Sequence, residues 1–425
     1  MPLKKLIAIL AAIGLCTLGV VLLFWPSASS SDGKSSASVN RVDTNAAAYA
    51  YTTERELVVM RGDRVLTRVS RLFDEADSAH NKVIWTQSGD YIALLSDTTL
   101  LQEDSSQITL ITVNTHTGAQ KRMACPYCAD IIAVDANSVL AAKDIPGDYS
   151  GATVRRFDLD RPGSSVPVNL SLEGDNLFTG SFLISTRSYI LTNKYVTSSG
   201  SSGEEELELL KSDNSTKNWL GGYDANDYLP AAAAENPRGG GERFAVAIRD
   251  KPGICATDFP ILVFDATGIS VVTDMSAAEP PGYVKDTQGG MDVNDLWWGL
   301  DGHLHATITS WTCDKTKDSE AAKKILAHPS TLWRLDGTKW SMERSSPATM
   351  VRQLDTTSEI VLVIPDCIGV ATFDKGQVYC HTGNLYRDQA GKRTLVAANV
   401  ISISTPPVHV APILVMPSPY WVQSG

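Results

Sequence analysis

Apolar and polar residues alternate over most of this chain. From about residue 47 onward, short apolar runs with a period of two are separated by Gly, Asp, Asn and Ser. Successive side chains of a strand point to opposite faces of a sheet, so this period predicts β-strands, and the polar breaks predict turns. The pattern therefore predicts an all-β domain over residues 47–405.

A unit of strand, tight polar turn and second strand recurs along this domain. Its copies are residues 57–69, 108–123, 153–168, 207–220, 261–273, 332–342 and 385–396. Their turns are about 50 residues apart, and such a period in an all-β chain is typical of a β-propeller, whose blades are four-stranded sheets. Further strands are predicted within residues 83–95, 131–142, 182–192, 243–248, 296–309 and 359–364. We predict seven blades, with six or eight as the alternatives, and two long loops at residues 198–206 and 231–242.

One motif resembles a known superfamily. The stretch Trp85-Thr-Gln-Ser-Gly-Asp-Tyr-Ile-Ala93 resembles the W-S-P-D-G-x-x-I-A unit of TolB-like and WD-repeat-like propellers, and residues 298–305 are a looser copy. Residues 113–118 and 263–268 are similar to the D-x-x-T-G hairpin of that superfamily. The resemblance covers about residues 50–400 and implies a propeller without indicating one family. No blade carries a Trp-Asp dipeptide.

The chain begins with an apolar run, from Leu6 to Trp25, that contains no charged residue. A run of about 20 such residues can cross a bilayer as a helix, and Lys4 and Lys5 favour a cytoplasmic N-terminus. We expect a cytoplasmic tip (1–5), a transmembrane signal anchor (6–25), a flexible stalk rich in Ser and Ala (26–46) and the propeller on the extracytoplasmic side of the cell membrane. A cleaved signal peptide and a lipoprotein acylated at Cys16 are the alternatives.

The cysteines fit that location. Six of the seven lie beyond the apolar run, and an even number outside the cytoplasm predicts disulfides. Many pairings are possible; we predict Cys125–Cys128, Cys255–Cys313 and Cys367–Cys380. The last pair flanks a predicted hairpin, whereas Cys255–Cys313 would join adjacent blades and follows partly by elimination.

Cys125-Pro-Tyr-Cys128 is also the active-site signature of glutaredoxins. In that chemistry a helix N-terminus makes the first thiol reactive. Here the following residues alternate and then turn, so we predict a structural loop disulfide. A redox role is the alternative, and it requires an exposed, reducible bond.

Other candidate chemistry is sparse. His303 and His305 alternate along a predicted strand and so share a face; with Asp292 or Asp295 they could bind a metal, although we favour a structural role. G-x-S-x-G, P-loop, H-E-x-x-H and EF-hand motifs are absent from the sequence. We therefore predict no catalytic residue, metal or cofactor.

The remaining features concern partners. The net charge of -11 disfavours binding to nucleic acid. The apolar, proline-rich stretch 406–425, from Pro406 to Tyr420 and Trp421, is either a closing strand of the ring or a segment that contacts a partner. Our first hypothesis is a protein-binding or scaffold module of a bacterial cell envelope, acting as an accessory subunit of a membrane complex. The second is an extracytoplasmic hydrolase or lyase whose acidic residues converge in the propeller funnel.

Overall fold

The alternating segments of the sequence form β-strands in the computed structural model. It describes residues 46–71, 82–96, 107–143, 153–161, 163, 165–168, 170, 181–186, 188–197, 203–212, 217–224, 228–236, 242–250, 260–265, 267–275, 278, 280–281, 289–312, 330–364 and 382–407. The regular elements within these ranges are the 27 strands β1 to β27, with no α-helix. The chain is therefore all-β there, as the period of two predicts.

Five sheets have four antiparallel strands each, paired in the order in which the chain makes them. One contains β4 (Ile84–Trp85), β5 (Tyr91–Leu95), β6 (Thr109–Asn114) and β7 (Gln120–Ala124). The next contains β8 (Cys128–Val134), β9 (Ser138–Lys143), β10 (Thr153–Asp158) and β11 (Ser165–Val168). The third contains β12 (Ser181–Ser185), β13 (Tyr189–Thr197), β14 (Gly203–Lys211) and β15 (Lys217–Asp224). The fourth contains β16 (Tyr228–Asn236), β17 (Arg243–Asp250), β18 (Pro260–Asp265) and β19 (Gly268–Asp274). The fifth contains β20 (Gly289–Trp298), β21 (Leu304–Thr312), β22 (Thr331–Asp336) and β23 (Lys339–Arg344).

The sixth sheet joins the two ends of the domain. It contains β24 (Met350–Gln353), β25 (Ser358–Val363), β26 (Gly383–Gln389), β27 (Lys392–Ser404), β1 (Ala48–Thr53), β2 (Glu56–Arg61) and β3 (Arg64–Ser70), in that order. The first part of β27 pairs with β26. Its last part pairs with β1, from Val400 opposite Thr53 to Ser404 opposite Ala50. Asn399, just before that part, has a left-handed backbone with φ of 58°.

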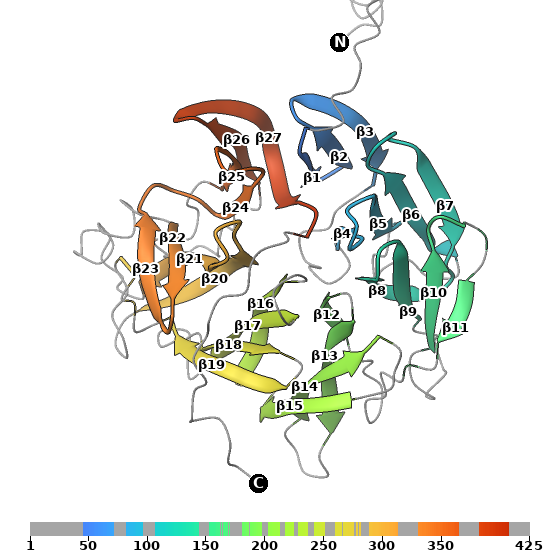
Figure 1. Ribbon diagram of the computed structural model, residues 1–425, viewed down its shortest axis with the longest axis horizontal. Coiled ribbons are helices and arrows are strands. Elements are labelled where there is room, and N and C mark those ends of the chain that lie inside the picture. The colour runs from blue at the N-terminus through green and yellow to red at the C-terminus, as the bar shows by residue number, and fades with distance from the viewer. Residues whose placement is uncertain are drawn as a thin grey trace, which may run out of the picture. The chain divides into compact units, whose positions relative to one another are not determined.

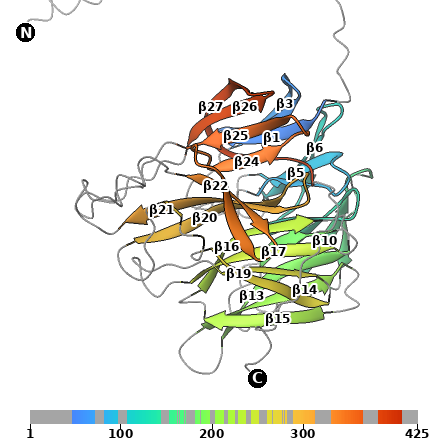
Figure 2. The same cartoon turned by 60° about the vertical axis from the view of Figure 1, so that its left-hand side comes forward.

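The sheets follow one another around a common centre (Figure 1). The first strand of each four-stranded sheet contacts the first strand of the next, in the order β4, β8, β12, β16, β20, and β20 contacts β24. In both Figure 1 and Figure 2, β27 lies beside β1. Antiparallel four-stranded sheets around an axis are the architecture of a β-propeller.

The apolar core lies between neighbouring sheets. The described residues form seven apolar clusters, and each of them joins two successive groups of strands. Strand β2 shows why. Leu57 and Val59 pack toward β4–β6, whereas Val58 and Met60 pack toward β25–β27. Both faces of such a strand are buried, so its sequence is continuously apolar instead of alternating.

The predicted hairpins are confirmed, since each of the seven recurring units matches two consecutive paired strands, from β2 and β3 to β26 and β27. The two predicted loops were partly wrong. Residues 203–206 begin β14, and residues 231–236 end β16, which is an inner strand. Ala-rich stretches show no period of two, and small side chains fit where inner strands approach the axis. Sequence alternation therefore could not reveal β16.

Several predictions fall outside the described residues. They concern the run from Leu6 to Trp25, the stalk, and the end of the chain at Tyr420 and Trp421. Among the residues that the structure describes, no helix is long and apolar enough to cross a membrane. The strand that closes the ring is the last part of β27, ahead of Pro406.

Ile403→Ala should destabilise the fold strongly. Ile403 is 3% exposed in the cluster between β1, β2 and β25–β27, and truncating a buried isoleucine costs about 2–4 kcal/mol. Leu395→Ala, on the same strand but 61% exposed, is the matched control and should change the free energy of unfolding by less than about 0.5 kcal/mol. Urea unfolding followed by tryptophan fluorescence measures both. Equal effects of the two variants would show that the closing strand is not part of the folded core.

Candidate functional site

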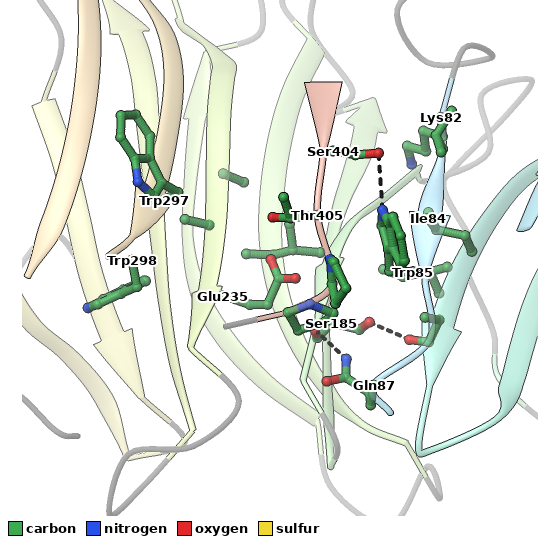
Figure 3. Close-up of a pocket in the computed structure, with 18 of the residues that line it drawn as sticks. Lys82, Ile84, Trp85, Gln87, Ser185, Glu235, Trp297, Trp298, Ser404 and Thr405 are labelled. Atoms are coloured by element: carbon green, nitrogen blue, oxygen red, sulfur yellow. Dashed lines mark hydrogen bonds between the residues drawn. The ribbon is translucent and has the colours of Figure 1, made fainter. Parts of the chain in front are cut away.

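The inner strands enclose a cavity of about 290 Å³. It is lined from β4, β8, β12, β16, β20, β24 and the end of β27, and by Lys82, Gln87 and residues 405–407 (Figure 3). Of the predicted site residues, Pro406 borders this cavity. Pro406 packs against Gly89 in the turn between β4 and β5, where an added Cβ would lie 3.0 Å from the Pro406 Cβ. The described end of the chain thus forms part of the wall.

β-Bulges shape four of the inner strands. The register shifts between Cys128 and Asp130 in β8 and between Val293 and Asp295 in β20. It also shifts in β12 and β16. A bulge re-aims the side chain that follows it. Asp130 and Asp295 come directly after their bulges, and both bond to the next inner strand of the ring.

Two ion pairs connect inner segments of neighbouring sheets. Asp130 accepts hydrogen bonds from Lys82 Nζ at 2.6 Å and from the backbone N–H of Phe182 at 2.7 Å. Lys82 also donates to the carbonyl of Phe182. Arg352 of β24 makes a two-point contact with Asp295, with Nη2 2.9 Å from Oδ1. Both cations that line the cavity are therefore engaged by a carboxylate of a neighbouring inner strand.

Gln87 is held at the cavity by one half of its amide. The side chain is 8% exposed, and its Nε2 donates to the carbonyl of Ser185 at 3.0 Å. Ser185 in turn donates to the carbonyl of Ala133. The Gln87 Oε1 atom has no hydrogen-bond partner among the described residues. The amide is thus fixed, and it leaves an unused acceptor.

Glu235 supplies the one carboxyl group among the described residues that line the cavity. It lies on β16, is half-buried, and is drawn near Thr405 in Figure 3. Burial raises the pKa of Glu235 to about 7. A hydrogen bond from its own backbone N–H and the charge of Arg352 lower the pKa by less than burial raises it. The group therefore changes charge near neutral pH.

Tryptophans form much of the apolar wall. Trp85 donates from Nε1 to Ser404 Oγ at 3.0 Å and so fastens β4 to the end of β27 (Figure 3). The Trp297 ring stacks on His305, with centroids 5.5 Å apart, and Arg352 lies 5.5 Å from the same ring's centroid. The face of Trp297 is thereby used within the protein.

His305 is a buried imidazole with a hydrogen bond at each ring nitrogen. Its Nε2 is 3.0 Å from Asp301 and its Nδ1 is 3.1 Å from Glu343. Burial alone would lower the pKa of His305, but the hydrogen bonds with the two carboxylates outweigh it and raise that pKa. Burial likewise opposes the shift of Asp301, whose pKa is lowered to about 2 mainly by the hydrogen bond with His305. We call His305 and its two carboxylate partners, Asp301 and Glu343, the His305 clamp, because the protonated imidazole holds both carboxylates.

The histidine pair does not assemble the metal site considered from the sequence. His303 bonds to the carbonyl of Leu335 and lies 3.4 Å from Asp336, while Asp295 is engaged by Arg352. Within the described ranges, no group of three or more His, Cys, Asp or Glu side chains is placed to hold a metal ion.

Cys125 and Cys128 form a disulfide, in agreement with the predicted pairing. Both residues are fully buried, in the cluster between the β4–β7 and β8–β11 sheets. Burial does not fit the exposed bond that a redox role requires. Cys255, Cys313, Cys367 and Cys380 lie outside the described residues.

Comparison with known proteins assigns the chain to no family. No protein-family model matches the chain, and no curated protein matches it. The β-propeller domain of the trilobed protease from Pyrococcus furiosus is similar, with 9% identity over 81% of this chain and 87% of that chain and a TM-score of 0.44. The polysaccharide lyase Uly1 is similar with 9% identity over 82% of this chain and 90% of that chain, and its TM-score is 0.44. An acylaminoacyl peptidase from Pyrococcus horikoshii is similar with 10% identity over 82% of this chain and a TM-score of 0.42. The match covers 52% of that chain, about half of the peptidase. At these identities and scores the similarities carry no inference about this chain.

The Cys125–Cys128 bond should resist reduction in the folded chain. Both sulfurs are shielded from solvent, and thiol–disulfide exchange requires access for the attacking thiolate. Treatment with graded dithiothreitol, alkylation and mass spectrometry should label neither cysteine until denaturant is added. Labelling at low dithiothreitol, while the fold persists, would restore the redox hypothesis.

The His305 clamp should stabilise the fold more at low pH than at high pH. Since the pKa of His305 is raised by folding, its contribution is complete below about 6.5 and is lost as pH rises through the folded-state pKa. His305→Gln should therefore lower the free energy of unfolding by about 1–3 kcal/mol more at pH 6 than at pH 9. His116→Gln, which removes an exposed pair with Asp90, is the control and should have little effect. A His305→Gln effect that did not change with pH would contradict the charged His305 clamp.

Proposed function

We propose that this chain is a membrane-anchored β-propeller that binds a protein partner on the extracytoplasmic side of a bacterial cell membrane. The partner is another envelope protein, and the chain acts as an accessory subunit of its complex. The apolar run from Leu6 to Trp25 supports the anchor. Lys4 and Lys5 support the orientation, with the N-terminus in the cytoplasm.

The pairing of the charged groups at the cavity is the observation that supports a binding role. Hydrolysis of glycosides commonly uses two carboxyl groups flanking the scissile bond. Among the described lining residues Glu235 is the one carboxyl, and Lys82 and Arg352 are each held by an aspartate that ties strands together. The polar groups of this site thus mostly hold the ring, which supports recognition more than catalysis.

We also propose that the ring has seven blades. The last part of β27 with β1, β2 and β3 would form one four-stranded blade, and β24–β26 with the first part of β27 would form another. The seven apolar clusters support this count, because a closed ring has as many interfaces as blades and β2 packs on a different neighbour with each face. The long strand β27 would then serve two blades.

An extracytoplasmic hydrolase or lyase is the second candidate. Glu235 favours it, because a carboxyl group with a pKa near 7 can donate and accept protons at neutral pH. This function requires a further reacting group at the cavity and a turnover that Glu235→Gln abolishes. A binding module requires neither.

Purification of the full-length protein from native membranes in mild detergent should retain an envelope protein at fixed stoichiometry. The chain without residues 6–25 is the control. A partner kept by both forms is bound by the propeller, and a partner kept by the full chain alone is bound through the N-terminal segment. A monomer in both preparations would contradict the binding role and direct attention to hydrolytic assays.

A further inference from the structure

The described charges around the central cavity leave one acid without a matching cation. Lys82 pairs with Asp130, and Arg352 pairs with Asp295. Glu235 is influenced by Arg352, but the guanidinium already makes two contacts with Asp295. Taken together, these two cations and three carboxyl groups carry one negative charge when Glu235 is ionised. The cavity therefore complements a single positive charge.

The remaining wall suits an organic group. Trp85 and Ile84 of β4, Ile132 of β8 and Ile184 of β12 line the same cavity. A protonated amine or guanidinium on a short aliphatic stem has donors for the two oxygens of the Glu235 carboxylate and an apolar part for such a wall. A hydrated metal ion would gain nothing from these side chains, because metal sites need several oxygen, nitrogen or sulfur ligands.

We propose that the central cavity binds one organic cation, a protonated amine or guanidinium, through the Glu235 carboxylate. The inference rests on the proposed binding function and gives the chemistry of what is recognised. The cation comes either from a free small molecule or from a lysine or arginine side chain of the partner protein. Both sources share the same charged group.

Binding should be coupled to release of a proton. Besides Glu235, the charged groups that line the described cavity are Lys82 and Arg352, which pair with Asp130 and Asp295. Burial raises the pKa of Glu235 to about 7. A cation favours the ionised carboxylate. Affinity should therefore rise about tenfold between pH 6 and pH 8, as expected for a free-state pKa of about 7.

Calorimetry on the full-length protein in detergent tests the proposal with methylguanidinium chloride and, as its neutral analogue of the same shape, N-methylurea. We expect methylguanidinium to bind, with release of a proton near pH 7, and N-methylurea not to bind. Glu235→Gln should weaken the binding by at least about tenfold. Glu54→Gln, at an exposed carboxyl between β1 and β2, should leave it unchanged.

A peptide arm distinguishes the two sources of the cation. The blocked tripeptide Ala-Arg-Ala is compared with the same peptide carrying neutral citrulline. Binding of the arginine peptide at least as tight as that of methylguanidinium indicates a partner's side chain, and binding of the small cation alone indicates a free ligand. Absence of methylguanidinium binding, or equal binding by folded Glu235→Gln, would overturn the proposal.

The outcome is separable from that of the proposed function. If the membrane partner is retained but no cation binds, the binding module stands and the cavity is not its contact. If cations bind in the manner described but no partner is retained, the cavity is a small-molecule site and the scaffold role fails.

Discussion

The pairing of the last part of β27 with β1 is the constraint on which the rest of the structure depends. It joins residues far apart in the chain, and Thr52 and Ser402 bond across it at 2.7 Å. Without it, β1 would present an open strand edge, and the apolar cluster shared with β25–β27 would lose one of its walls. The inner strands enclose a cavity because this pairing holds them in a ring.

The charged groups at the cavity are arranged by the inner strands. Asp130 and Asp295 follow bulges in β8 and β20. Asp130 meets Lys82, just before β4, and the backbone N–H of Phe182 on β12, whereas Asp295 meets Arg352 on β24. These pairs satisfy the positive charges that the lining contains. Glu235 differs from the two aspartates, because Arg352, whose charge lowers the pKa of Glu235, is already bound by Asp295. The ion pairs that connect neighbouring sheets thus leave Glu235 as the carboxyl group without a cation of its own.

Much of the fold could be predicted from the sequence, because hairpins are local. Turns such as the one at Gly62, where φ is positive, lie between runs whose side chains alternate. Closure could not be predicted, because the partner of β1 is set by the geometry of the whole ring. Glu235 was missed for a related reason: it ends an alanine run that has no polar–apolar period, so residues 231–242 were interpreted as a loop. The burial of Cys125 and Cys128 agrees with the structural interpretation of their motif, whereas the ion pair of Asp295 with Arg352 had no signal in the sequence.

The distance along the chain between the two partners of the closing pair sets a waiting time during synthesis. Thr52 and Ser402 are 350 residues apart, and a ribosome adds about 5–20 residues per second. The first three strands are therefore made roughly 20–70 s before the strand that covers their edge exists. During that interval the nascent domain has an uncovered strand edge and an uncovered apolar face. A chaperone that shields such surfaces would therefore have to stay bound longest to the segment that forms β1 to β3.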